Sequence, residues 1–338
     1  MAEQEAAARP SDMSLEQEMA LEYAIPPRQR FNPLRWARRE PFGAFGLVLI
    51  ILVSIGAGAA PLLYTTDPQQ FGAGAPLAGP CINCSSSDVN HLAYREGVEW
   101  REHRLFGTTP RGRDLWSRVL YGGRVSLKVG VATVLIGTMA GTIIALLAAY
   151  AGGVVDFAVG RLADMIIAIP GILLALTLHT AIGQDLPDLP GLSRQELTLV
   201  LAISAFFMPG TYRIMRGMVL ELRESQYVEA AQVVGASSLR IMWRHITPNM
   251  FGLMIVITSI SLPAAILVEA SLSFLGLGVE PGTPSWGADL SGDSQKFFTQ
   301  GWWLAIFPGL ALSMTVFGFN IFGDSLRDTL DPRLRGRI

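Results

Sequence analysis

Long apolar stretches alternate with shorter polar, glycine-rich or proline-rich segments along most of this chain. Each stretch is long enough to cross a hydrocarbon core of about 30 Å as a helix. The pattern therefore predicts an all-α membrane protein with about six transmembrane helices. The predicted spans are residues 42–63, 125–150, 157–182, 197–219, 251–275 and 304–322.

Prolines predict irregularities within two of these spans. Pro170 is expected to kink the third span, and Pro209 with Gly210 is expected to break the fourth, because proline removes a backbone hydrogen bond and crowds the preceding turn. Arg161 and Asp164 lie one turn apart in the third span and are expected to form an ion pair. The turn between the second and third spans is short, so we expect these helices to pack side by side, antiparallel.

A polar segment between the fourth and fifth spans has its own helical signals. Gly235 is expected to end a first short helix, and Ser237 or Ser238 to cap a second one. Thr247 and Pro248 then form a start signal for the fifth span. The apolar face of the first short helix follows the spacing i, i+3, i+4, i+7 through Tyr227, Ala230, Ala231 and Val234.

Arginines indicate which side of the membrane these segments occupy. They cluster before the first span and again after the fourth, where Arg213, Arg216 and Arg223 lead into the polar segment. The positive-inside rule therefore places the N-terminus and the polar segment in the cytoplasm. The predicted organisation is a partly disordered cytoplasmic segment (1–41), a first span (42–63), an extracytoplasmic loop (64–124), a core of five spans (125–324) that includes the polar segment (220–249), and a cytoplasmic tail (325–338).

Composition narrows the possible functions. Half of the 338 residues are hydrophobic, 16% are charged and the mean hydropathy is +0.38. The net charge of -2 is not concentrated in a basic face, which argues against a nucleic-acid partner. The chain has no Gly-Lys-Ser/Thr loop that follows a strand, so it is not expected to bind ATP itself.

Cys81 and Cys84 are the two cysteines of the chain and lie in the predicted extracytoplasmic loop. They have no histidine neighbour at ligand spacing, so no metal site is predicted. A disulfide between them is the expected state in an oxidising exterior.

Glu269 lies inside an apolar stretch of the fifth span. An intramembrane carboxylate is costly, and usually faces the bundle interior or water. Two interpretations remain open, a role in the translocation path or gate, and a buried, hydrogen-bonded structural acid. Residues 276–302, which are rich in proline and aromatic residues, are interpreted as an interfacial lid on the outer side.

The polar segment resembles the EAA loop of binding-protein-dependent ABC importer permeases. The matching residues are Glu229-Ala230-Ala231, Gly235 and Pro248, and EAAQVVGAS followed by RHITPN is most similar to the C-type permease subunit of dipeptide, oligopeptide and nickel importers. The resemblance implies a MetI-like permease fold in which this loop is the cytoplasmic coupling helix. The implied ATPase-coupling residues are Glu229, Ala230, Ala231, Gly235, Ala236, His245 and Pro248.

A second segment supports the same resemblance. The stretch FGTTPRGRDL, followed by Ser117-Arg118 and Tyr121-Gly122, is similar to the GTDxxGRDxxSRxxYG segment of peptide-importer permeases, with Thr109 in place of the first Asp. A role in gating or in contact with the binding protein and a purely structural clamp both remain open. The motif residues are Gly107, Thr108, Gly112, Arg113 and Asp114.

The resemblance implies a non-catalytic permease subunit of an ATP-driven importer for dipeptides or oligopeptides. The implied partners are a homologous permease subunit, two ATPase subunits that carry ATP and Mg²⁺, an extracytoplasmic solute-binding protein and membrane lipid. The implied location is the inner membrane of a prokaryote, with both termini cytoplasmic. A nickel importer of the same family is one alternative. A self-contained channel or secondary transporter is another, although Glu269 is its only strong candidate residue.

Overall fold

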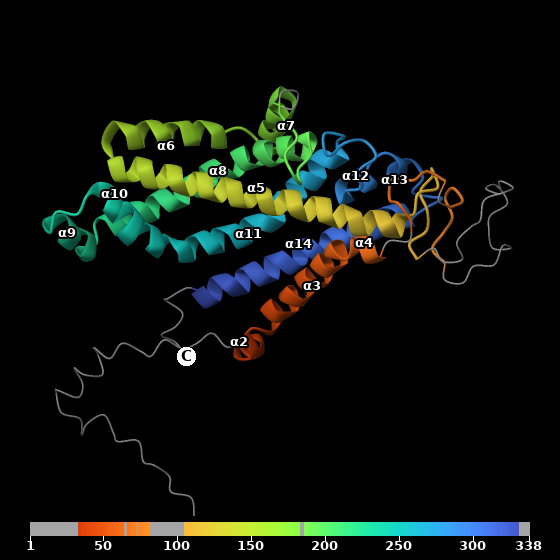
Figure 1. Ribbon diagram of the computed structural model, residues 1–338, viewed down its shortest axis with the longest axis horizontal. Coiled ribbons are helices and arrows are strands. Elements are labelled where there is room, and N and C mark those ends of the chain that lie inside the picture. The colour runs from red at the N-terminus through yellow and green to blue at the C-terminus, as the bar shows by residue number, and fades with distance from the viewer. Residues whose placement is uncertain (1–32, 64–65, 73, 82–104, 183–185, 331–338) are drawn as a thin grey trace, which may run out of the picture. The chain divides into compact units, whose positions relative to one another are not determined.

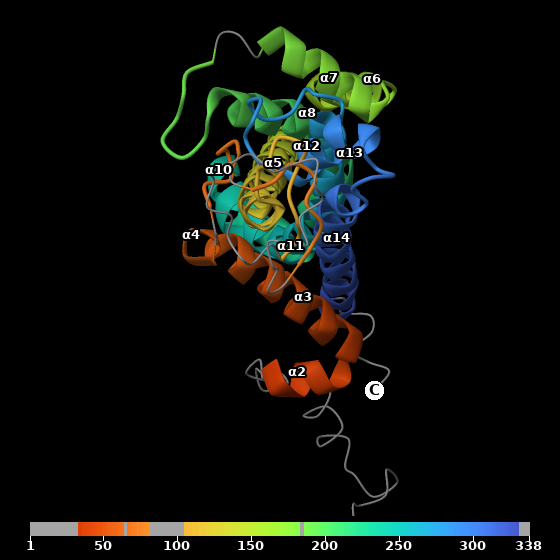
Figure 2. The ribbon, with the colours of Figure 1, turned by 90° about the vertical axis from the view of Figure 1, so that its right-hand side faces the viewer.

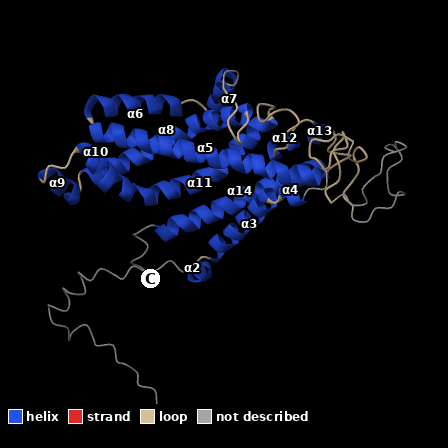
Figure 3. Ribbon diagram, viewed as in Figure 1, coloured by secondary structure: helices blue, strands red, loops and turns tan. Residues whose placement is uncertain are grey.

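The computed structural model describes residues 33–63, 66–72, 74–81, 105–182 and 186–330 (Figure 1). Regular structure in these residues is helical, with two isolated β-bridges (Figure 3). The predicted all-α membrane fold is confirmed. The short helix α2 (Pro33–Arg39) is not part of the unit Glu40–Ile338, to which the helices described below belong.

Five helices in the described part of the chain are long and apolar enough to cross a membrane. A sixth span results if α6 and α7 are counted together, in agreement with the predicted number. The five are α3 (Pro41–Gly58), α5 (Leu115–Ala151), α8 (Arg194–Arg223), the helix Ser238–Phe274 that includes α11 (Thr247–Phe274), and α14 (Trp303–Leu330).

Helices α5 and α8 form the centre of this unit, and α5 packs more extensively against α8 than against any other helix. Small residues allow the close approach, because a Cβ added at Gly141 would lie 2.6 Å from Met208 O. Figures 1 and 2 show α6 and α7 on one side of this pair, and α3 beside α14 on the opposite side. Helix α11 packs against both α5 and α14.

The third predicted span is broken, not kinked. It consists of α6 (Gly153–Ile167) and α7 (Gly171–Ile182), whose axes differ by 97°. Pro170 lies at the break, as expected, and Gly171 begins α7 directly against the Phe206 ring of α8, where a Cβ would overlap the ring. The change of direction is therefore a full break at Pro170, where a kink within one helix was predicted.

The fourth predicted span, in contrast, is continuous. Helix α8 runs through Pro209, so the predicted break there is wrong. Pro209 is buried, and its neighbour Met208 contributes the carbonyl that lies closest to Gly141 of α5. Neighbouring helices commonly support a proline within a membrane helix in this way.

The predicted pair of Arg161 with Asp164 is also wrong. Asp164 lies 3.9 Å from Arg213 of α8, and the Arg161 guanidinium lies 5.4 Å from the Phe157 ring. The Asp164–Arg213 pair depends on the packing of α6 along α8, which spacing within α6 does not reveal. Asp156 of α6 accepts two hydrogen bonds from the Arg216 guanidinium of α8, each 2.6 Å long.

Helices α5 and α14 extend furthest beyond their predicted bounds. Helix α5 begins at Leu115 and not at Val125, because the Asp114 carboxylate accepts a hydrogen bond from Ser117 N (3.0 Å) and caps the helix. Helix α14 continues to Leu330, past the predicted end at Phe322. The first span agrees closely with its prediction, since α3 is followed directly by the short helix α4 (Ala60–Leu63).

Candidate functional sites

The EAA-like segment and the Gly107–Asp114 segment lie at opposite ends of the helical unit (Figure 1). One end carries α9 (Gln226–Val233) and α10 (Ser238–Ile241) and is called the α9 end. The other carries α12 (Trp286–Leu290) and α13 (Asp293–Lys296) and is called the α12 end. Figure 3 shows most of the loop residues gathered at the α12 end.

At the α9 end, Gly235 ends helix α9 as predicted. It has a φ of 84°, a backbone conformation that glycine adopts without strain. Gly235 N donates to Gln232 O (2.9 Å) and Ala236 N donates to Ala231 O (3.0 Å), which is the hydrogen-bond pattern of a Schellman cap. Ser237 then precedes α10 as its N-cap residue.

Pro248 does not begin a separate helix, which corrects the predicted start signal. A π-helical turn, η4 (Met242–Ile246), joins α10 to α11, and Thr247 is already helical. Pro248 has no N–H to donate within this turn, and two neighbouring side chains add hydrogen bonds to carbonyls of the turn. Thr247 Oγ1 donates to Met242 O (2.9 Å), and Asn249 Nδ2 donates to His245 O (2.7 Å). The second short helix and the fifth span therefore form one element, Ser238–Phe274.

Buried apolar side chains attach the α9 end to the rest of the chain. Val228, Ile241 and Ile246 pack in one cluster with side chains of α8, and Ala231 and Ala236 lie against the same cluster. The predicted face of α9 is therefore divided. Ala231 is half-buried, whereas the other three positions of that face are exposed, namely Tyr227, Ala230 and Val234.

The opposite surface of the α9 end is apolar and uncovered. Val233 and Val234 are 82% and 88% exposed, and Leu239 and Trp243 are also largely exposed. Among the implied coupling residues, Glu229, Ala230, Gly235 and Pro248 are exposed, and Ala231, Ala236 and His245 are half-buried. Glu229 forms no ion pair with any residue in the described part of the chain.

At the α12 end, the residues Gly107–Asp114 form a tight loop. Gly107 and Gly112 have positive φ values of 78° and 69°. A Cβ on Gly107 would lie 2.6 Å from Ala78 O, so glycine is needed there for space as well as conformation. The Thr108 hydroxyl donates to Ala75 O and accepts from Ala78 N (2.9 Å), and Trp303 Nε1 donates to Thr108 O (3.1 Å).

A buried ion pair holds several segments together beside this loop. Arg118 Nε donates to Asp289 Oδ1 of α12 (2.7 Å), and the same guanidinium donates to Pro68 O (3.0 Å) and Gly282 O (3.2 Å). Trp286, also in α12, is buried and donates from Nε1 to Val119 O (3.0 Å). The sequence placed Trp286 in the predicted lid but gave no sign of Asp289 or of the contacts of either residue, because their partners are distant in the chain.

The charges of this end are strongly influenced by burial. Burial raises the pKa of the Asp289 carboxyl, and the Arg118 guanidinium opposes that rise. Burial lowers the pKa of Arg113, and Arg118 and Arg111 lower it further. The Arg113 guanidinium lies 4.1 Å from the centre of the Phe71 ring, a cation–π contact that fixes this part of the loop.

Comparison with known proteins gives the family. Residues 137–336 match the binding-protein-dependent transport system inner membrane component family. This chain belongs to that family. It is therefore an inner-membrane permease component of a binding-protein-dependent ABC transport system.

Similar relatives agree with this family assignment over most of their length. The chain is 39% identical to the glutathione transport system permease protein GsiD of Pectobacterium atrosepticum over 301 residues, which are 89% of this chain and 90% of the relative. It is 33% identical to the dipeptide transport system permease protein DppC of Alkalihalophilus pseudofirmus over 310 residues, 92% and 91% of the two chains.

Glu269 lies deep inside this permease. It is fully buried on α11, and Ser273 Oγ donates to its Oε1 (2.8 Å). It lines neither of the cavities at the α12 end, which have volumes of about 810 and 290 Å³. Its Oε2 is buried with no hydrogen-bond partner among the described residues, so both predicted roles of Glu269 stay predictions.

The predicted disulfide falls partly outside the described residues. Cys81 is disulfide-bonded, and Cys84 lies outside the described part of the chain. The predicted external lid, residues 276–302, contains α12 and α13, and its Trp286 and Asp289 connect it to α5.

Proposed function

We propose that this permease subunit imports peptides or peptide-like solutes. In the proposed assembly it pairs with a homologous permease subunit, two ATPase subunits and an extracytoplasmic solute-binding protein. The names of its relatives refer to dipeptide and glutathione transport, which supports a peptide-like solute over nickel. ATP and Mg²⁺ belong to the ATPase subunits in this assembly, and the chain itself binds no cofactor.

The observation that carries the proposal is the uncovered apolar surface of the α9 end. Val233, Val234, Leu239 and Trp243 are exposed on a segment between two membrane spans. Exposed apolar patches of this kind mark contact with another protein or with a membrane, and the arginines that flank this segment favour a position outside the bilayer. We assign the ATPase subunit as the partner, with Ala230 and Gly235 allowing close approach and Glu229 available to a basic group.

Continuity of the helix Ser238–Phe274 supports a mechanism for coupling. A movement of the docked α9 end is carried along this helix, because no loop separates α10 from α11. Helix α11 packs against α5 and α14. The proposed effect of ATP binding on the partner subunits is therefore a shift of α11 against these two helices, which opens or closes the solute path.

The proposed orientation places the α9 end in the cytoplasm and the α12 end outside. Arg213, Arg216 and Arg223 near the α9 end support it. A single cysteine at Ser237 should be protected from an impermeant thiol reagent in intact cells, whereas one at Gln70 should react. Reaction of the Ser237→Cys variant from outside would contradict this orientation.

Transport by the whole importer tests the function. The permease pair, the ATPase subunits and the binding protein are reconstituted in liposomes, and uptake of dialanine is compared with uptake of Ni²⁺. The expected result is dialanine uptake that requires both ATP and the binding protein. Nickel uptake alone would identify the other importer class, and uptake without ATP would identify a self-contained carrier.

A further inference from the structure

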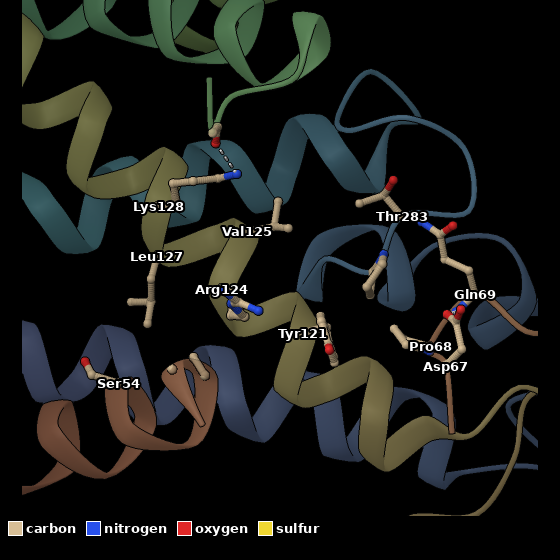
Figure 4. Close-up of a pocket in the computed structure, with 14 residues that line it drawn as sticks. Ser54, Asp67, Pro68, Gln69, Tyr121, Arg124, Val125, Leu127, Lys128 and Thr283 are labelled. Carbon is tan, nitrogen blue, oxygen red and sulfur yellow. Dashed lines mark hydrogen bonds between the residues drawn. The ribbon is translucent and has the colours of Figure 1, made fainter. Parts of the chain in front are cut away.

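A cavity of about 810 Å³ opens at the α12 end between α3, α5 and three loops (Figure 4). Small-molecule sites typically have volumes of about 300–1,000 Å³. Small residues leave this space open, since Ala57 and Gly58 of α3 and Gly191 line its wall. The cavity is therefore large enough for a short peptide, and its charged side chains indicate which chemical groups it would accept.

Two cations of α5 line the cavity, and only one of them is neutralised. The Lys128 ammonium lies 2.6 Å from Glu196 Oε1 and also donates to Gly191 O (3.0 Å). Arg124, one turn earlier, is exposed and forms no hydrogen bond or ion pair with any residue that the structure describes. Its guanidinium lies 5.6 Å from the centre of the Tyr121 ring.

Figure 4 shows Arg124 in the middle of the cavity wall, between Leu127 and Tyr121. The Tyr121 ring limits the positions that its guanidinium adopts, so less freedom is lost when a ligand binds. A guanidinium accepts a carboxylate or a phosphate through two parallel hydrogen bonds. Arg124 is thus suited to hold an anionic oxygen group within the cavity.

A carboxylate lies on another wall of the same cavity. Asp67 is exposed in the loop after α4, and its Oδ1 accepts a hydrogen bond from Gln69 N (2.9 Å). Asp67 makes no ion pair with Arg124 or with any other described residue. The cavity therefore presents a cation and an anion on separate walls, each available to a ligand of opposite charge.

We propose that this cavity binds a zwitterionic solute by its two free termini, with the carboxylate at Arg124 and the ammonium at Asp67. The proposal rests on the proposed function, and specifies the solute as a peptide with both termini unmodified. A phosphatidylethanolamine headgroup carries the same two charges, and exposed apolar residues of α3, such as Leu52 and Ile55, adjoin this wall. The test distinguishes these two sources.

The test uses the complete importer in phosphatidylcholine nanodiscs, with Cys81 and Cys84 replaced by serine. A single cysteine is placed at Ser54, which lines the cavity, and its rate of reaction with a neutral maleimide is measured. Dialanine should slow this reaction, whereas its C-terminal amide and its N-acetyl derivative should protect much less. Arg124→Gln and Asp67→Asn should each weaken protection by dialanine about tenfold, the size of one charge-assisted hydrogen bond.

Two further variants control for general effects. Arg124→Lys keeps the positive charge and should retain part of the protection. Arg111→Gln removes an exposed cation at the same end that does not line this cavity, and should leave protection unchanged. Protection that is equal for dialanine and its blocked derivatives, or that survives both Arg124→Gln and Asp67→Asn, would overturn the proposal.

The same measurement in nanodiscs that contain phosphatidylethanolamine distinguishes a bound lipid headgroup from a bound peptide. If phosphatidylethanolamine in the nanodiscs slows the reaction and dialanine adds nothing, the occupant is lipid and the solute assignment is wrong. The uptake assay of the unaltered importer is independent of this result. Dialanine uptake without Arg124-dependent protection overturns only the cavity assignment, whereas absence of peptide uptake overturns the proposed function.

Discussion

The motif residues at the two ends of this permease have opposite surroundings. At the α12 end the side chains are bonded within the chain, and Arg118 is only 4% exposed. At the α9 end the apolar residues beside the motif face outward, and Val234 is 88% exposed. The motif at the α12 end thus stabilises the subunit itself, whereas the motif at the α9 end adjoins a surface that is available to a partner.

This difference separates two kinds of mutational effect. Changes at the α12 end should act mainly on stability, because they leave buried polar groups without partners. Changes on the exposed surface of the α9 end should act mainly on assembly and coupling, because surface substitutions usually change stability by less than about 0.5 kcal/mol. The following variants test that separation.

The largest loss of stability is expected for Asp289→Asn. Arg118 would remain buried without its counter-charge, and breaking one partner of a buried pair costs about 3–5 kcal/mol. Thermal unfolding of the purified complex measures the change. Asp293→Asn is the matched control, because its contact with Arg111 is exposed and 3.9 Å long, and it should cost less than about 1 kcal/mol. Equal effects of the two variants would contradict the comparison.

Arg118→Met should make stability depend on pH. The pKa of the Asp289 carboxyl then stays raised by burial, and only the charge of Arg113 opposes that rise. A carboxyl whose pKa is higher in the folded state stabilises below its unfolded pKa, and this contribution is lost as pH rises through the folded pKa. The variant should therefore be more stable in mild acid than at neutral pH, relative to the parent. A parallel pH profile for both proteins would contradict this prediction.

Ala231→Leu and Ala230→Leu should separate the two faces of α9. Ala231 lies against the buried cluster, so a larger side chain there should cost about 1–3 kcal/mol. Ala230 is exposed, so the same change should leave the unfolding temperature nearly unchanged and reduce the amount of ATPase subunit that copurifies. The prediction fails if Ala230→Leu is as destabilising as Ala231→Leu.

The sequence predicted those features whose cause is local. Hydrophobic runs located the spans, and the position of Gly235 after a short helix located its left-handed conformation. Features set by distant contacts were missed. Arg118 and Asp289 are 171 positions apart, and the pairing of Asp164 with Arg213 depends on how α6 lies along α8. The merging of α10 with α11 was missed because the π-helical turn Met242–Ile246 carries the helix through to Pro248.

Gly235→Val should have a moderate effect that arises from backbone conformation alone. No atom lies within 4 Å of an added Cβ at this position, so crowding contributes nothing. The left-handed conformation costs a non-glycine residue about 1–2 kcal/mol, and a β-branched residue tolerates it poorly. Gly235→Asn should cost less, because asparagine adopts this conformation more readily. Reduced solute-stimulated ATP hydrolysis in the valine variant, with normal rates in the asparagine variant, is the expected result.

The smallest effect on stability, combined with the clearest effect on assembly, is expected for Val234→Asp. Its side chain touches little within the subunit, so unfolding should shift by less than about 0.5 kcal/mol. A carboxylate placed in the proposed apolar contact would lose its hydration there without gaining a partner, and the ATPase subunit should dissociate during purification. Phe298→Asp is the matched control, because it introduces the same charge at an exposed apolar position of the α12 end. That variant should retain a full complement of ATPase subunits, and loss of the ATPase from both variants would mean that the two ends do not differ in the way proposed.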